Sequence, residues 1–259
     1  MDDSEVCHPF SDLISSICFS PKHDYLAAGS WDRTRGKNHH FNSCTFAYIP
    51  LNQDGSKVLS SGADNVALIL DAESGCVSQF ARHKQPIKVV RSFENSHQNI
   101  FVTGSWDKTV KLWDARTEGP VAMIAILEWC YALDVRYPFM ALGMASPQFQ
   151  TFDLRRSTSC HRGSQGTVYA VNDIVQHPIH GTLATCGTFN CSHCCLNGLP
   201  RPVPCASFNR NGTLLAYAVS YDWSRGVAGM TLNHPNQLML HACRDHKVWR
   251  RVRGQDPVK

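Results

Sequence analysis

Apolar and polar residues alternate over short runs along much of this chain. In residues 109–113, Thr-Val-Lys-Leu-Trp, the side chains of Val110 and Leu112 fall on one face of an extended strand. One unit recurs: an apolar strand, a turn, a second strand ending in small residues, and a polar corner. Its copies begin near residues 14, 49, 87, 131, 169 and 205. Short alternating runs separated by turn residues predict an all-β fold.

The spacing of the copies predicts a β-propeller. Gly55 and Gly181 occupy equivalent turns, Asp54-Gly55 and His180-Gly181, and lie about three periods of 42 residues apart. Asn211-Gly212 forms a third such turn, and these dipeptides predict positive φ at both central positions of a tight hairpin. Repeats of about 40 to 45 residues that end in Trp-Asp are typical of four-stranded propeller blades. The fullest copy is 87–119.

The corner GSWDKTVKLWD (104–114) contains the first candidate for a specific side-chain arrangement. Asp107 precedes a strand, where a buried carboxylate needs hydrogen-bond partners. His83, Ser105 and Trp113 are placed to supply a hydrogen-bonded corner. We therefore interpret these four residues as structural and not as catalytic.

Composition fits a folded chain. Hydrophobic residues make up 43% of the 259 residues, and the longest apolar stretch, 121–127, is too short to span a bilayer. The N-terminus is acidic and has no apolar run, so we do not expect a secretory signal or membrane insertion. The 12 cysteines are therefore interpreted as reduced thiols of a cytosolic or nuclear protein.

The formal net charge of +4 is concentrated at one end. Residues 241–259 hold six Lys or Arg and two Asp, which accounts for the whole excess. We expect a propeller domain over 1–240 and a basic tail over 241–259, able to contact RNA phosphates or acidic peptides or to remain solvated.

Several phrases resemble a known family. GSWDKTVKLWDAR (104–116), CYALDVRYP (130–138), YAVNDIVQHPIHGTLAT (169–185) and FNRNGTLLAYAVSYDWSRG (208–226) resemble the WD-repeat mRNA export factors of the nuclear pore, the Rae/Gle family. The sister propellers of the spindle checkpoint, the Bub family, share the YAVN strand and the Ser-Trp-Asp corner, and are the nearest alternative. HPIHGTLAT and YDWSRG resemble the export factors more closely.

The resemblance implies a seven-bladed propeller without catalytic activity or cofactor. It implies binding of a GLEBS-type peptide on a nucleoporin, location in the nucleus and at the pore in the nuclear envelope and also in the cytoplasm, and roles in mRNA export and the mitotic spindle. RNA or ribonucleoprotein is a further partner that it suggests. A checkpoint propeller would instead prefer peptides of kinetochore kinases.

The chain is too short for seven full blades. Seven repeats of 42 residues need roughly 290 residues. The shortfall falls after residues 29–34 and after residues 183–188, where no third strand or Trp-Asp ending follows, and between residues 152 and 169. We therefore expect about six recognisable blades, some of them incomplete.

The candidate partner-binding residues lie at predicted rim positions. Four occupy matching corners of two repeats, and three belong to the SYDWSRG phrase, a loop that the family resemblance implicates in binding. Exposed Trp and basic side chains suit an acidic, partly extended peptide. The set is Trp31, Arg33, Trp106, Lys108, Tyr221, Trp223 and Arg225.

A cluster of cysteines and one histidine supports a different hypothesis, a zinc-bound module over residues 186–205. Cys191 and Cys194 form half of a zinc knuckle, and no second CxxC is present. We therefore expect thiols and no metal. The cluster is Cys186, Cys191, His193, Cys194, Cys195 and Cys205. The sequence also contains no Gly-rich phosphate loop or nucleophile elbow, so we do not expect an enzyme.

Overall fold

The computed structural model describes 14 stretches of the chain, and every regular element in them is a β-strand. The described residues are 3–6, 13–20, 26–30, 57–71, 73–95, 98–114, 116–145, 149–155, 160–163, 171–179, 183–187, 191–192, 202–221 and 236–243. Within these residues there is no helix of the length and apolarity needed to cross a bilayer.

The first half of the chain forms three antiparallel sheets. The first sheet contains β2 (Ile14–Phe19) and β3 (Leu26–Ser30). The second contains β4 (Lys57–Ser61), β5 (Val66–Asp71) and β6 (Val77–Arg82). The third contains β7 (Ile87–Asn95), β8 (Gln98–Ser105), β9 (Thr109–Asp114) and β10 (Pro120–Ala125).

The second half forms three more. They are β11 (Cys130–Arg136), β12 (Phe139–Met144), β13 (Phe149–Asp153) and β14 (Cys160–Gly163); β15 (Val171–Gln176), β16 (Leu183–Gly187) and β17 (Cys191–Ser192); and β18 (Ala206–Phe208), β19 (Leu214–Val219) and β20 (Gln237–Ala242) with β1 (Asp3–Glu5). The basic tail was predicted to begin at residue 241, inside β20, and the residues from 244 onward lie outside the described part.

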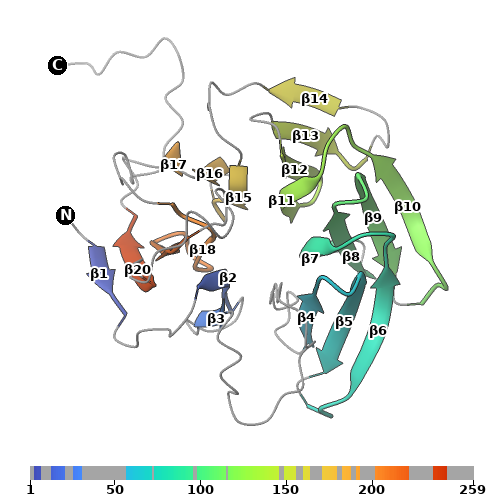
Figure 1. Ribbon diagram of the computed structural model, residues 1–259, viewed down its shortest axis with the longest axis horizontal. Helices are drawn as coiled ribbons and strands as arrows, with labels where there is room; N and C mark the ends of the chain where they lie inside the picture. Colours follow the sequence, from blue (N-terminus) through green and yellow to red (C-terminus); the bar gives the residue numbers. More distant parts are fainter. Residues whose placement is uncertain are drawn as a thin grey trace.

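The sheets are arranged radially, as in a propeller (Figure 1). The inner strands β7, β11, β15, β18 and β2 contact one another in that order around the centre, whereas β6, β10 and β14 lie at the periphery. The predicted all-β propeller is confirmed, and the six sheets within the described residues fit the expectation of about six blades. The predicted best repeat, 87–119, forms a complete four-stranded sheet together with β10.

The two ends of the chain meet in one sheet. Strand β1 pairs antiparallel with β20, with Ser4 opposite Leu240. This pairing covers the outer edge of β20, which would otherwise expose unpaired backbone groups. The N-terminal segment therefore ties the last sheet to the first part of the chain.

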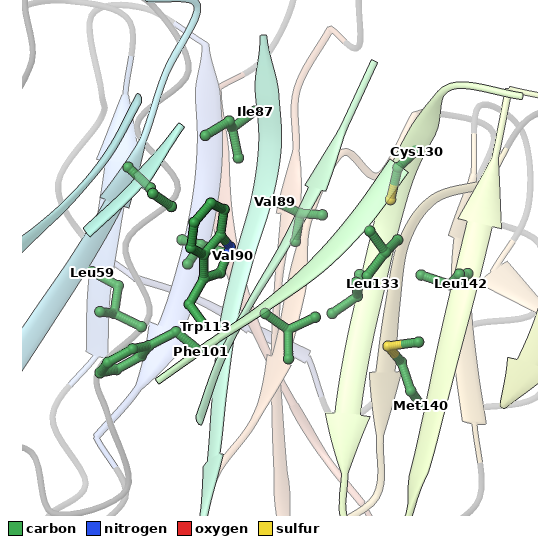
Figure 2. Close-up of a cluster of buried hydrophobic side chains, with 14 of the residues drawn as sticks. Leu59, Ile87, Val89, Val90, Phe101, Trp113, Cys130, Leu133, Met140 and Leu142 are labelled. Carbon is green, nitrogen blue, oxygen red and sulfur yellow. The ribbon is translucent and has the colours of Figure 1, made fainter. Parts of the chain in front are cut away.

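Apolar residues on both faces of the inner strands form the core between sheets. Figure 2 shows the largest cluster, in which Ile87, Val89 and Val90 of β7 lie between Leu59 on one side and Leu133 and Leu142 on the other. All six of these side chains are at most 1% exposed. Burying each contributes roughly 1.5–3 kcal/mol, so the packing of β7 between its neighbours holds three sheets together.

Side chains also satisfy the inner strands across sheet boundaries. The Asp134 carboxylate of β11 accepts the N–H of Gln176 at 2.7 Å, and Asp173 of β15 accepts the N–H of Ala206 at 3.0 Å. Ser207 of β18 accepts the N–H of Phe19 at 3.1 Å. An inner strand has no neighbouring strand on its channel side, so its backbone groups need such partners. These contacts join four successive sheets.

The turn at 209–212 departs from the prediction. The Gly212 N–H donates to the carbonyl of Asn209 at 3.0 Å, and Gly212 has φ +68°. Asn211 does not have positive φ, so the prediction for both positions is wrong here. The connection is a longer turn in which only the last residue needs the left-handed conformation. Asp54-Gly55 and His180-Gly181 lie outside the described residues.

Candidate functional site

The corner between β8 and β9 is organised around the carboxylate of Asp107. Its Oδ1 accepts hydrogen bonds from the backbone N–H and the hydroxyl of Thr109, at 3.0 and 2.6 Å. Its Oδ2 accepts from the Nδ1 of His83 at 2.9 Å and from the N–H of Lys84 at 3.1 Å. A carboxylate has about four acceptor sites, so Asp107 is saturated by structural contacts and has no lone pair left for catalysis.

His83 connects this corner to the interior of the sheet through Thr103. The Nε2 atom of His83 lies 2.7 Å from the Thr103 hydroxyl, which also accepts the indole N–H of Trp113 at 2.8 Å. The Ser105 hydroxyl donates to the carbonyl of Gln85 and accepts the Asp107 N–H. The structure thus brings together all four residues predicted for the corner, His83, Ser105, Asp107 and Trp113.

Thr103, Thr109 and Lys84 belong to this network but were not predicted from the sequence, and Thr103 is the most deeply buried of them. It lies inside β8 and is fully buried, where a β-branched residue is expected for its strand propensity alone. The one sequence signal for its role is its position four residues before Asp107. At this spacing, β8 and the corner place Thr103 and Asp107 on either side of the His83 ring.

The network fixes the protonation states of its members. Burial lowers the pKa of His83, and the attraction of Asp107 only partly offsets this. For Asp107, burial acts to raise the pKa, but hydrogen bonds from Thr109, Lys84 and His83 outweigh it and the net pKa is lowered. A neutral imidazole that donates through Nδ1 to an ionised Asp107 and accepts at Nε2 from Thr103 satisfies the two shortest contacts of His83.

An aromatic patch lies beside this corner on the same rim. The ring of Trp106 stacks on that of Trp129, with 5.5 Å between the ring centroids and an interplanar angle of 18°. The ring centroid of Tyr131 lies 6.3 Å from that of Trp106. Lys108 forms an ion pair with Glu128 at 3.3 Å. We name as the rim patch the residues Lys84, Trp106, Lys108, Leu127, Glu128, Trp129 and Tyr131.

The rim patch presents apolar surface to solvent. Trp129 is 42% exposed and Leu127 is 57% exposed. Its two lysines and one glutamate give it a net positive charge. The loop 126–129 is fixed against the corner because the Ile126 N–H donates to the carbonyl of Lys108 at 2.9 Å. Rigid exposed aromatic side chains beside cations are typical of surfaces that bind peptides.

Lys108 holds an unfavourable backbone conformation at this place. Its φ is +63°, in the left-handed region that glycine or asparagine adopts more easily. The equivalent corner of the preceding sheet has Asn65 with φ +68°. The long basic side chain is therefore presented at the patch at a conformational cost that glycine would avoid.

Of the other predicted binding residues, the structure describes only Tyr221. Tyr221 is buried, with 4% of its surface exposed. Trp31, Arg33, Trp223 and Arg225 lie outside the described residues. Sequence reasoning missed Trp129, Leu127 and Tyr131, which come from the segment that enters the next sheet. Trp129 and Tyr131 contact Trp106 only through the packing of adjacent sheets.

The cysteine cluster is only partly described. Cys186 and Cys205 are buried in apolar clusters, and Cys186 lies opposite Cys191 in the pairing of β16 with β17. His193, Cys194 and Cys195 lie outside the described residues. Among the residues that the structure describes, no group of three or more His, Cys, Asp or Glu side chains is placed to hold a metal ion.

Comparison with known proteins gives a consistent result for the repeat and the fold. The family model described as "WD domain, G-beta repeat" matches residues 4–34 and 74–114. Two solved WD-repeat structures superpose on this chain. "Structure of U3-55K" has a TM-score of 0.65, covering 92% of this chain and 98% of that one, and "Crystal structure of RRP9 WD40 repeats" has 0.66, with 94% and 98%. Both are 13% identical, so they show the fold alone.

Three similar proteins extend over nearly the whole chain. The "mRNA export factor GLE2" of Chaetomium thermophilum is 31% identical, covering 93% of this chain and 90% of its own length. The "Poly(A)+ RNA export protein" of Schizosaccharomyces pombe is 32% identical, with 92% and 90%. "Protein Rae1" of Drosophila melanogaster is 30% identical, with 95% of both chains. The first alignment spans 321 positions against 259 residues here, so that relative contains segments that this chain lacks.

Proposed function

The chain belongs to the family of the GLE2 and Rae1 mRNA export factors, and from this premise we propose that it is a non-catalytic adaptor in the export of mRNA. Its partner in this proposal is a nucleoporin that carries a GLEBS-type peptide. The relatives named above are export factors by their own names. The single observation that carries the choice of site is the stacked Trp106–Trp129 pair on the rim.

The rim patch has the chemistry that an acidic, partly apolar peptide needs. Trp129 and Leu127 offer apolar contact area that is already exposed and held rigid by the corner. Lys84 and Lys108 can attract and orient carboxylates, and Lys108 can exchange its exposed partner Glu128 for a carboxylate of the peptide. An exposed ion pair of this kind contributes little to stability, so its exchange costs little.

The cellular setting follows from the same proposal. An adaptor of this kind acts in the nucleus and at the pore in the nuclear envelope, and also reaches the cytoplasm. RNA or ribonucleoprotein is a second partner, contacted through the basic residues of the tail 241–259. Such a contact would weaken steeply as salt is raised.

Fluorescence anisotropy with a labelled GLEBS-type nucleoporin peptide tests the proposal. We expect saturable binding by the full chain, and a loss of about tenfold or more when Trp129 is replaced by alanine, because an exposed aromatic anchor commonly contributes 1.4 kcal/mol or more. Lys108→Glu should weaken peptide binding more at low salt than at high salt, because salt screens the charge of this exposed position.

Met123→Ala is the matched control, because Met123 is 63% exposed on the outer strand β10 and lies away from the patch. Equal binding by the Trp129→Ala and Met123→Ala variants would show that the rim patch does not bind the peptide. Absence of binding by the unmodified chain would rule out the proposed adaptor function. A kinetochore-kinase peptide that displaces the nucleoporin peptide at lower concentration would favour the checkpoint alternative.

A further inference from the structure

A second candidate site lies at the other end of the inner strands. A cavity of about 410 Å³ is lined by residues from the middle to the end of β2, β7, β11, β15 and β18, and from the segments just after them. Ser92, Arg136 and Arg210 are among them. The rim patch lies instead where the chain enters β7 and β11, so the two sites are on opposite faces of the propeller.

The charge of the cavity wall is positive. Three arginines and one aspartate line it, Arg91, Arg136, Arg210 and Asp134, which leaves a net charge of +2. Asp134 already accepts from Arg91 at 3.1 Å and from the Gln176 N–H at 2.7 Å. The carboxylate is therefore occupied within the wall by Arg91, and the other two arginines of the lining are Arg136 and Arg210.

Arg136 and Arg210 are exposed at the mouth of this cavity. One Arg136 guanidinium nitrogen donates to the carbonyl of His177 at 3.2 Å, which orients the side chain without neutralising it. Among the described residues, no carboxylate lies within ion-pair distance of Arg136. The Ser92 hydroxyl makes no hydrogen bond within the described part of the chain and can donate to a ligand.

From these features we propose that this cavity binds a compact small molecule that carries several phosphate groups. The volume falls in the range of small-ligand sites, roughly 300–1,000 Å³, and walls formed by five strands favour a compact ligand over an extended peptide. Guanidinium groups pair with phosphate oxygens through two parallel hydrogen bonds. A cleft lined by one sign of charge also concentrates the opposite charge from solution.

Calorimetric titration of the full chain with inorganic tripolyphosphate, ATP and citrate tests this site. We expect tripolyphosphate to bind at one equivalent per chain and citrate to bind at least tenfold more weakly. Tighter binding of ATP would identify a nucleotide as the source of the phosphates, and equal binding would show that the phosphates alone are recognised. Absence of stoichiometric binding by both phosphate probes, or equal binding of citrate, overturns the proposal.

Charge reversal locates the binding. The double variant Arg136→Glu with Arg210→Glu should weaken tripolyphosphate binding by tenfold or more. Arg82→Glu makes the same kind of change at an exposed end of β6 and should leave it unchanged. If the double variant does not fold, judged by its circular dichroism spectrum, Arg210→Glu alone should still weaken binding severalfold. Equal losses in the Arg82 variant and the mouth variants would show nonspecific attraction and overturn the site.

Discussion

The Nδ1 atom of His83 lies 2.9 Å from Oδ2 of Asp107, and this contact joins the segment before one sheet to the corner between two of that sheet's own strands. The side chains are almost fully buried, with exposed fractions of 0% and 7%. The position of the rim patch depends on this contact, because Trp106 and Lys108 flank Asp107 directly.

Replacing Asp107 by alanine should destabilise the fold by about 2–4 kcal/mol. The change leaves the donors of His83, Lys84 and Thr109 without their acceptor, and a buried donor left unsatisfied costs about 1–3 kcal/mol. Chemical denaturation measures the difference. Asp64→Ala is the control, because Asp64 occupies the same corner of the preceding sheet but is exposed and accepts the N–H of Val66 at 3.3 Å. Similar losses in the two variants would contradict the role assigned to His83.

The contribution of His83 to the stability of the protein should decrease as the pH is lowered below about 6.5. Burial lowers the pKa of folded His83, whereas the unfolded chain takes up a proton near pH 6.5. Below about pH 6.5 the unfolded state therefore binds more protons than the folded state. The free energy of unfolding decreases as the pH is lowered through this window. Asp107, whose pKa is also lowered, adds a change of the same sign only below about pH 3.8.

The His83 contribution is the difference between the unmodified chain and a His83→Asn variant across pH 5 to 8. Burial raises the pKa of Asp173 to about 6, which acts in the opposite direction, but this group is present in both proteins and cancels. We expect a shallower slope in the variant. Parallel curves would show that His83 does not titrate differently in the folded and unfolded states.

Asp134→Ala should loosen the junction between neighbouring sheets. The change removes the acceptor of the Arg91 guanidinium at 3.1 Å and of the Gln176 N–H at 2.7 Å. The ion pair is partly buried and Arg91 keeps Asp173 at 3.7 Å, so we expect a loss of about 1–3 kcal/mol, mainly from the Gln176 N–H left without an acceptor. Hydrogen exchange should show the loss first in the amide of Gln176 and its neighbours in β15. An unchanged exchange pattern with the same global stability would mean that packing alone holds this junction.

The repeat made the propeller predictable, because strand alternation and turn spacing are local properties of the sequence. The corner was largely accessible for the same reason, since Asp107 and Trp113 belong to one short phrase. Thr103 was not, because a threonine inside a strand has an ordinary explanation. Trp129 was not either, because its stacking on Trp106 depends on how two sheets pack, and spacing along the chain does not encode that distance.

Gly212→Ala should destabilise the last sheet for two independent reasons. The residue has φ +68°, which costs an L-amino acid about 1–2 kcal/mol. A Cβ atom there would also lie 2.3 Å from the ring of His177, whose Nε2 contacts the Gly212 carbonyl at 3.1 Å. His177 is itself 2% exposed and packs edge-on against Phe208, so it has little room to move.

We therefore expect the Gly212→Ala variant to lose about 3 kcal/mol or more in the free energy of unfolding. This is larger than the cost of the positive φ alone. Gly75→Ala separates the two causes, because Gly75 has the same φ of +68° and a Cβ there would meet no atom within 4 Å. The Gly75 variant should lose only the conformational term, and thermal unfolding of both variants provides the comparison. If the two losses are equal, the close approach of His177 to the turn makes no contribution, and the contact between β15 and the following sheet is looser than these distances indicate.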